Sequence, residues 1–185
     1  MNKIIAIVGM CGSGKSIASD ILVEKGYEKV YFGGVTMEKL KENNLEVTPE
    51  NEKMMREKLR ADLGMGAFAK ILLPRIKELA KTKNVVLDGL YSWDEYLIIE
   101  KELQDNLFMI GIITDKKLRY SRLETREIRP LTSEEAKKRD LAEIENIAKA
   151  PPIAYADYYV LNNGTIEEYK SRLEEILKEI EEWKN

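Results

Sequence analysis

The sequence predicts an α/β protein in which helices surround a parallel β-sheet. Short apolar segments, typical of buried strands, alternate with longer segments of helical periodicity along the whole chain. The first apolar segment, residues 3–8, leads directly into a glycine-rich loop, and a helical segment follows that loop. The length of 185 residues suits one domain, and no repeat or long linker divides the chain. We therefore expect residues 1–185 to form a single domain.

Five segments are expected to be the strands of this sheet. Each is short, and the apolar runs among them are typical of strands that are covered on both faces. They comprise residues 3–8, 29–32, 84–88, 107–113 and 157–161.

The helices of the first half of the chain have recognisable ends. Gly26 is placed to cap a helix over residues 14–25, and a short helix is expected over residues 36–43. Thr48 and Pro49 begin a long helical stretch that reaches about residue 81. Three residues within this stretch are possible breaks: Gly64, Gly66 and Pro74.

The helices of the second half begin with capping signals. A helix over residues 116–126 is expected to stop before Pro130. Three other helices begin with a Ser or Thr that Glu follows three residues later, and these caps are Ser92, Thr132 and Thr165. Pro151-Pro152 is expected to end the helix that begins at Thr132.

The composition narrows the possible function classes. Hydrophobic residues make up 44% of the chain and charged residues 34%, which is typical of a globular protein. The formal net charge of −3 gives no general attraction to nucleic acid or to an anionic membrane, so we expect neither as a partner. The absence of histidine excludes that residue as a general base or metal ligand. The single cysteine, Cys11, excludes an intramolecular disulfide and fits a cytoplasmic protein.

The loop from Gly9 to Ser16 carries the strongest chemical signal, because it matches G-x-x-x-x-G-K-[ST] in full. Glycines let successive backbone N–H groups point at one anion, and the helix that follows adds its positive N-terminal end. Lys15 is expected to contact the β and γ phosphates, and Ser16 to coordinate Mg²⁺. A chance match is disfavoured, because the motif follows an apolar strand and opens a helix. We expect ATP with Mg²⁺ to bind at Gly9, Gly12, Ser13, Gly14, Lys15 and Ser16.

Cys11 lies inside this loop and has two possible roles. It is either a small residue that fills space or a reactive thiol activated by the positive end of the helix. The first role is favoured, because the sequence offers no second catalytic partner for a thiol.

A candidate metal ligand ends the third expected strand. Asp88 stands in the segment VVLDG, directly after an apolar run. An Asp at a strand end holds Mg²⁺ in proteins with this phosphate loop, and carboxylate and water are ligands that Mg²⁺ prefers. The alternative is an Asp that ends a strand in an ordinary turn. The phosphate loop favours the metal site, with Ser16 and Asp88 as its protein ligands.

Four arginines recur at intervals of 3, 4 and 3 residues: Arg119, Arg122, Arg126 and Arg129. The first three are expected on one helical face. Phosphoryl transfer uses such groups, because negative charge spreads over the γ-phosphoryl oxygens in the transition state. We expect Arg119 to bind the nucleotide and Arg122 and Arg126 to act in catalysis. The alternative is a surface network with two acidic neighbours, Glu124 and Glu127.

A second pair of arginines is a candidate for binding the acceptor. Arg56 and Arg60 are four residues apart on the long helix that begins at Pro49. Two cations on one turn suit an acceptor phosphate. A surface helix stabilised by salt bridges explains them almost as well.

These motifs together resemble the nucleoside monophosphate kinase group of P-loop proteins. The likeness rests on GMCGSGKS after the first strand, Asp-Gly after the third, and the R-x-x-R-x-x-x-R segment. The chain is most similar to the archaeal adenylate-kinase-related proteins, through VVLDGLYS, ADYYVLNNGTIEEY and the KLR segment at Arg60. Dephospho-CoA kinases are more distant and share the strand-Asn-x-Gly-Thr ending. The resemblance covers nearly the whole chain.

The resemblance implies a P-loop fold with a five-stranded parallel sheet in the order 2-3-1-4-5. It also implies a helical acceptor-binding region over about residues 33–80 and a short lid over about residues 126–135. Three positions depart from the group. Gly34 and Met37 stand where an Asp and an Arg usually follow the second strand, and Tyr91 stands where an Arg often follows Asp-Gly. The residues expected to bind the acceptor are therefore Arg56, Arg60 and Tyr91.

We expect an ATP-dependent phosphotransferase that moves the γ-phosphoryl group to a small, nucleotide-like acceptor. A dephospho-CoA kinase is one alternative, although no clear acidic base follows the second strand. An NTP-hydrolysing switch protein without a small-molecule acceptor is an alternative of another class. A binding module without chemistry is disfavoured by the intact loop, Asp88 and arginines. The chain is expected to act as a monomer or homodimer.

Overall fold

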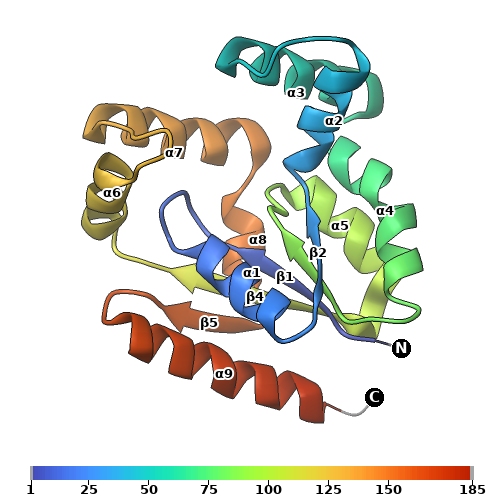
Figure 1. Cartoon of the computed structure of the whole chain (residues 1–185), viewed down its shortest axis with the longest axis vertical. Coiled ribbons are helices and arrows are strands. Elements are labelled where there is room, and N and C mark those ends of the chain that lie inside the picture. Colours follow the sequence, from blue (N-terminus) through green and yellow to red (C-terminus); the bar gives the residue numbers. More distant parts are fainter. Residues whose placement is uncertain (1, 184–185) are drawn as a thin grey trace.

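The computed structural model describes residues 2–183 and contains a five-stranded sheet (Figure 1). All neighbouring strands are parallel, and their order is β2-β3-β1-β4-β5, which confirms the order that the family resemblance implied. The strands are β1 Ile4–Val8, β2 Glu28–Tyr31, β3 Val85–Asp88, β4 Leu107–Ile113 and β5 Tyr158–Leu161.

Helices cover both faces of the sheet. Those of the first half are α1 Lys15–Glu24, α2 Gly34–Glu42, α3 Pro49–Leu63, α4 Ala67–Leu79 and α5 Trp93–Leu103. A 3-10 turn, Gln104–Asn106, leads into β4. The remaining helices are α6 Lys116–Thr125, α7 Ser133–Ile147, α8 Ala150–Ala154 and α9 Ile166–Glu182.

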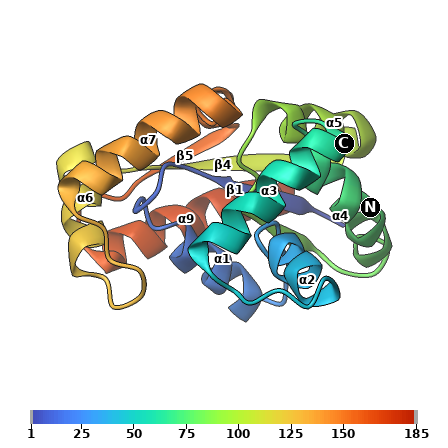
Figure 2. The same ribbon diagram turned by 90° about the horizontal axis from the view of Figure 1, so that it is seen from above.

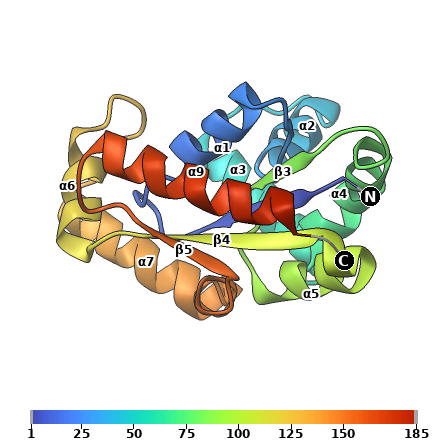
Figure 3. The same ribbon diagram turned by 90° about the horizontal axis from the view of Figure 1, so that it is seen from below.

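The alternation of side chains along β1 divides the core into two layers. Ile4, Ala6 and Val8 belong to the cluster that includes residues of α2, α3, α4 and α5. Ile5 and Ile7 belong to the cluster on the opposite face, which includes residues of α1 and α9. Figure 3 shows α9 crossing this face of the sheet. All five residues are almost fully buried, which explains why this strand is apolar without alternation.

The predicted caps are confirmed. The side chains of Thr48, Ser92, Thr132 and Thr165 each accept a hydrogen bond from a backbone N–H in the first turn of their helix. The last three form complete capping boxes with the Glu three residues later. These hydrogen bonds satisfy N–H groups that have no partner inside the helix.

Prolines misled the prediction at two places. Pro74 lies inside α4, and the long helical stretch breaks only between α3 and α4, where Gly64 has φ 84°. Pro74 is exposed, and the buried Leu72 and Ile76 on either side of it pack against the core, which holds the helix together. Pro151 does not end α7, which stops at Ile147. It lies in the first turn of α8, where a missing N–H costs nothing.

The loops at the carboxyl ends of the strands form one region of the surface. Seen from above in Figure 2, α6 and α7 lie on one side of the loop that follows β1, and α2 and α3 lie on the other. Ligands of open parallel sheets bind at this edge, where chain connections diverge to either side. The fold therefore places the predicted phosphate loop between two groups of helices.

Candidate active site

The phosphate loop is held from behind by its carbonyl oxygens. Arg119 donates to the Cys11 carbonyl at 2.9 Å, Asn162 Nδ2 to the Ser13 carbonyl at 2.8 Å and the Tyr169 hydroxyl to the Gly14 carbonyl at 3.0 Å. In a trans peptide the next N–H points opposite to the carbonyl. The N–H groups that follow these three carbonyls therefore face the other side of the loop, where they are available to an anion.

Two glycines of the loop are required by the backbone and by close packing. Gly12 has φ 79° and Gly14 has φ 99°, a region that other residues rarely adopt. A Cβ on Gly12 would lie 2.9 Å from the Arg119 carbonyl oxygen, and one on Gly14 would collide with Asn162. The glycines of the motif thus let the loop approach α6 and the end of β5 closely.

Lys15 begins α1, and its Nζ donates to the Met10 carbonyl at 2.9 Å across the loop. Burial, with the nearby positive charge of Lys149, lowers the pKa of Lys15 to about 7. A phosphate chain would stabilise the charged form that the surroundings now disfavour. Ser13 Oγ is buried and has no hydrogen-bond partner among residues 2–183, so the loop also holds an unused polar atom. Both features fit a phosphate ligand.

Asp88 lies beside the start of the phosphate loop. It is the last residue of β3 and pairs in register with Ile7 of β1. Its carboxylate is almost buried and lies 3.0 Å from Lys29 Nζ, which also contacts Asp20 at 3.2 Å. The prediction did not include Lys29, which would compete with a metal ion for Asp88.

The residues fit a magnesium ion only if phosphate supplies part of its coordination. Within the described residues, no group of three or more Cys, Asp and Glu side chains is placed to hold a metal ion. Ser16 is exposed at the start of α1, and Asp88 stands at the neighbouring strand end. Mg²⁺ commonly takes one or two protein oxygens and completes its shell with phosphate and water. Ser16 and Asp88 remain the candidate metal ligands.

The arginines that were expected to share one helical face have different surroundings. Arg119 is buried and forms a two-bond ion pair with Asp140 of α7, at 2.6 and 3.1 Å. Arg122 donates to Asn162 Oδ1 at 3.4 Å, and its Nη1 is buried without a partner in the part of the chain described. Arg126 follows the end of α6 in an extended conformation. The single-face prediction is therefore wrong for Arg126, because the helix ends one residue earlier.

The segment after α6 connects the expected lid to the expected acceptor region. Arg126 Nε donates to the Arg129 carbonyl at 2.7 Å, and Arg129 has φ 52°, unusual for a residue other than glycine. Its guanidinium forms two hydrogen bonds with Glu52 of α3, at 2.6 and 3.3 Å. Neither Glu124 nor Glu127 forms an ion pair with these arginines among the described residues. The alternative of a network with those two residues is therefore not observed.

The three candidate acceptor residues have different surroundings. Arg56 contacts Glu52 at 3.4 Å, so part of its charge is compensated. Arg60 is partly buried with its guanidinium over the Phe68 ring at 5.3 Å, and its Nε has no partner within residues 2–183. Tyr91 lies just after β3, and burial, with nearby negative charge, raises the pKa of its hydroxyl. It therefore stays neutral and can donate a hydrogen bond at ordinary pH.

Helix α7 contributes residues that the sequence did not reveal. Its Arg139 and Glu143 form an ion pair at 3.0 Å, and Glu143 also contacts Lys149 Nζ at 2.6 Å. Burial opposes the ionisation of Glu143, but the charges of Lys149 and Arg139 outweigh it and hold the pKa of this carboxyl below its usual value. Lys149 Nζ also lies 4.5 Å from the centre of the Tyr91 ring. The only sequence signal for this cluster was the four-residue spacing of Arg139 and Glu143, and such spacing of opposite charges is common on exposed helices.

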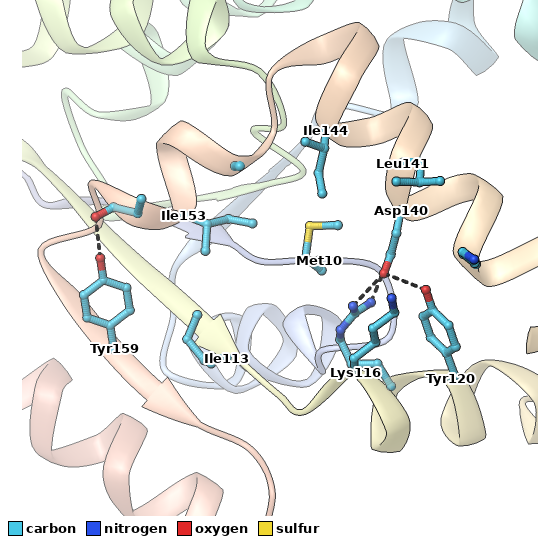
Figure 4. Close-up of a pocket in the computed structure, with 13 residues that line it drawn as sticks. Met10, Ile113, Lys116, Tyr120, Asp140, Leu141, Ile144, Ile153 and Tyr159 are labelled. Carbon is cyan, nitrogen blue, oxygen red and sulfur yellow. Dashed lines mark hydrogen bonds and ion pairs between the residues drawn. The ribbon is translucent and has the colours of Figure 1, made fainter.

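A cavity of about 450 Å³ lies between α6, α7, α8 and the ends of β4 and β5 (Figure 4). Met10 of the phosphate loop, Ile144 and Ile153 point into it, and the Asp140 carboxylate meets Arg119 and Tyr120 at its edge. Most of its lining is aliphatic. The cavity borders the phosphate loop from the side of α7.

Comparison with known proteins identifies the family. A family model described as an AAA domain matches residues 5–146. A UPF0200 protein from Sulfurisphaera tokodaii is 38% identical over 182 residues, which cover 96% of this chain and 97% of that protein. The chain belongs to the UPF0200 family. A second UPF0200 protein, from Thermococcus kodakarensis, is 32% identical over 181 residues, which cover 96% of this chain and 97% of that protein.

Solved structures agree with the fold of this UPF0200 chain. A protein from Thermus thermophilus, TT1252, has a TM-score of 0.66 at 19% identity and covers 96% of this chain and 97% of its own. Shikimate kinase from Bacteroides thetaiotaomicron has a TM-score of 0.59 at 12% identity and covers 97% of this chain and 98% of its own. At these identities the likeness concerns the fold, which is a P-loop kinase type. No helix within residues 2–183 is both long and apolar enough to cross a membrane.

Proposed function

We propose that the protein is an ATP-dependent phosphotransferase that moves the γ-phosphoryl group to a small, nucleotide-like acceptor. The observation that carries this proposal is the phosphate loop, in which three carbonyls are bound from behind, so that the N–H groups of Gly12, Gly14 and Lys15 face the other side. The Lys15 ammonium donates one hydrogen bond to the Met10 carbonyl and keeps two further N–H donors for a phosphate. The kinase-type fold and the AAA domain match support nucleotide binding. The proposal includes a cytoplasmic location and a monomeric or homodimeric protein.

In the proposed reaction, an oxygen of the acceptor attacks the γ-phosphorus and ADP leaves with the electron pair of the broken P–O bond. The loop N–H groups of Gly12, Gly14 and Lys15 orient the phosphates, and the Lys15 ammonium contacts the transferred group. The Ser13 N–H donates to the Met10 carbonyl at 3.2 Å, so Ser13 would contribute its unpaired Oγ. Mg²⁺, when bound beside Ser16 and Asp88, neutralises charge on the β and γ phosphates. Lys29 would release Asp88 or share it at that point.

The arginines have three distinct proposed roles. Arg122 would meet the nucleotide or the γ-phosphoryl group, a role that its unpaired buried Nη1 beside Asn162 supports. Arg126 reaches the phosphates only if residues 126–135 close as a lid, because it now bonds to the Arg129 carbonyl. Arg119 supports the nucleotide site through the Cys11 carbonyl and Asp140, in place of a direct phosphate contact.

The acceptor is proposed to bind between the phosphate loop and the helices of residues 33–80. Arg60 is the stronger candidate for its anionic group, because its Nε is buried and unpaired among the described residues. Arg56 is weaker, since Glu52 compensates its charge. With Gly34, Met37 and Tyr91 in place of charged residues, ordinary nucleoside monophosphates are expected to be weak or narrowly selected acceptors.

A screen with γ-labelled ATP tests the proposal. The panel contains the ribo- and deoxyribonucleoside monophosphates and dephospho-CoA, each with the wild type and with Lys15→Ala and Arg60→Ala. We expect label on at least one acceptor, no transfer by Lys15→Ala, and weaker transfer by Arg60→Ala. Transfer to dephospho-CoA alone would identify the first alternative. Steady hydrolysis without transfer to any acceptor would contradict the proposal and favour a switch protein.

A further inference from the structure

The inference concerns Lys149, a lysine that is 3% exposed at the junction of α7 and α8. Its Nζ lies 2.6 Å from the Glu143 carboxylate and 4.5 Å from the centre of the Tyr91 ring. Tyr91 follows β3 three residues after Asp88, at the edge of the sheet where the phosphate loop lies. A residue of the α7–α8 junction therefore places its charge against the expected acceptor side of the site.

The charges around Lys149 are not balanced. Arg139 and Lys149 both pair with Glu143, which is the one carboxylate within ion-pair distance of either in the described part of the chain. Two cations thus share one anion, although only Lys149 is buried, whereas the Arg139 side chain is 47% exposed. Lys149 therefore has a counter-ion that it shares with Arg139, and an anionic ligand would supply a second partner for its buried charge.

The backbone bends in an unfavourable way to place this lysine. Ala148 has φ 48° and ψ 52°, and the Lys149 N–H bonds to the Glu143 carbonyl at 3.2 Å. The left-handed conformation is disfavoured for alanine and persists where the surroundings enforce it. Such outliers cluster at functional sites. The turn directs Lys149 back beneath α7, towards Glu143 and Tyr91, where it is shielded from solvent.

We propose that Lys149, which its pairing with Glu143 holds over the Tyr91 ring, binds the anionic group of the acceptor. The neutral Tyr91 hydroxyl offers a hydrogen bond beside it. This assignment rests on the proposed phosphotransferase function, and it names an anionic, phosphate-like group as the part of the acceptor that the site selects. Glu143 competes with that group for Lys149, so binding exchanges one charged partner for another.

Binding of inorganic phosphate to the protein saturated with Mg²⁺ and a non-hydrolysable ATP analogue tests this proposal. The analogue fills the phosphate loop, including the γ position beside Lys15, so phosphate reports the second anion position. We expect Lys149→Gln to weaken phosphate binding roughly 10- to 100-fold, as loss of one charge-assisted contact predicts. Lys149→Arg should retain most of the affinity. The control Lys137→Gln changes an exposed lysine of α7 and should leave phosphate binding unchanged.

The same titration separates this proposal from a structural ion pair. If folded Lys149→Gln binds both the ATP analogue and phosphate as the wild type does, Lys149 only joins α7 to α8 and the proposal is overturned. Should that variant fail to fold, Glu143→Gln decides the question. Removal of the competing carboxylate should tighten phosphate binding, whereas unchanged or weaker binding would count against the proposal. Phosphate binding that depends on Lys149, without label transfer in the acceptor screen, would instead refute the phosphotransferase function.

Discussion

Nucleotide binding should take up a proton at Lys15 when the pH is above neutral. Burial, with the charge of Lys149, lowers the pKa of Lys15 to about 7 in the free protein. About nine-tenths of the protein would then carry a neutral Lys15 at pH 8, roughly half at pH 7 and about one-tenth at pH 6. Phosphates at the loop favour the ammonium form, so binding should restore the missing proton.

Isothermal titration in two buffers of different ionisation enthalpy measures this uptake directly. With Mg²⁺ and ADP we expect about 0.9 protons per nucleotide at pH 8 and roughly 0.5 at pH 7. The affinity should fall by up to about tenfold per pH unit above 7, because the competent charged form becomes scarce. Lys15→Arg is the matched control, since an arginine stays protonated and should show no such uptake. The reasoning would be refuted if the wild type binds ADP at pH 8 and takes up no more protons than the Lys15→Arg variant does.

Three further substitutions probe separate parts of the site. Asp88→Asn should raise the Mg²⁺ concentration needed for activity more than it changes nucleotide affinity, and an unchanged Mg²⁺ titration would make Asp88 a partner of Lys29 only. Arg126→Ala should lower kcat more than it raises the KM for ATP; if steady-state kinetics show lost stability with unchanged kcat, the lid role fails. Asp140→Asn should destabilise the protein by about 3–5 kcal/mol in urea unfolding, because it leaves Arg119 buried without its partner. Asp62→Asn, which changes an exposed carboxylate, is its control. If both substitutions lower the free energy of unfolding by the same small amount, the Arg119–Asp140 ion pair contributes little to stability.

Local sequence signals were sufficient for the strands, the helix caps and the phosphate loop, whereas the order of the strands came from the family resemblance. The apolar β1 and the capping boxes at Ser92, Thr132 and Thr165 each depend on residues within a few positions of one another. The loop motif likewise contains its own glycines and Lys15. Such features need no knowledge of the tertiary structure, which is why their positions were predicted to within a residue or two.

The partners of the loop could not be read from local patterns. Asn162 and Tyr169 hold the loop carbonyls from more than 140 positions away, and nothing in their own neighbourhood marks this role. Glu143 looked like one more acidic residue on an amphipathic helix, and Lys149 stood between two alanines in an unremarkable segment. Arg119 was assigned to phosphate from its spacing, but Asp140 became visible as its partner only in the folded chain.

Phosphorus NMR of a reaction with Mg²⁺, ATP and one candidate acceptor tests the central claim most directly. The spectrum distinguishes a phosphoryl group joined to the acceptor from one released as inorganic phosphate. The phosphotransferase account predicts that the γ signal of ATP decreases while a signal of a phosphorylated acceptor and the signals of ADP appear together, and that Lys15→Ala shows neither. Inorganic phosphate as the sole new product with every acceptor, formed at the same rate without any acceptor, would contradict the account.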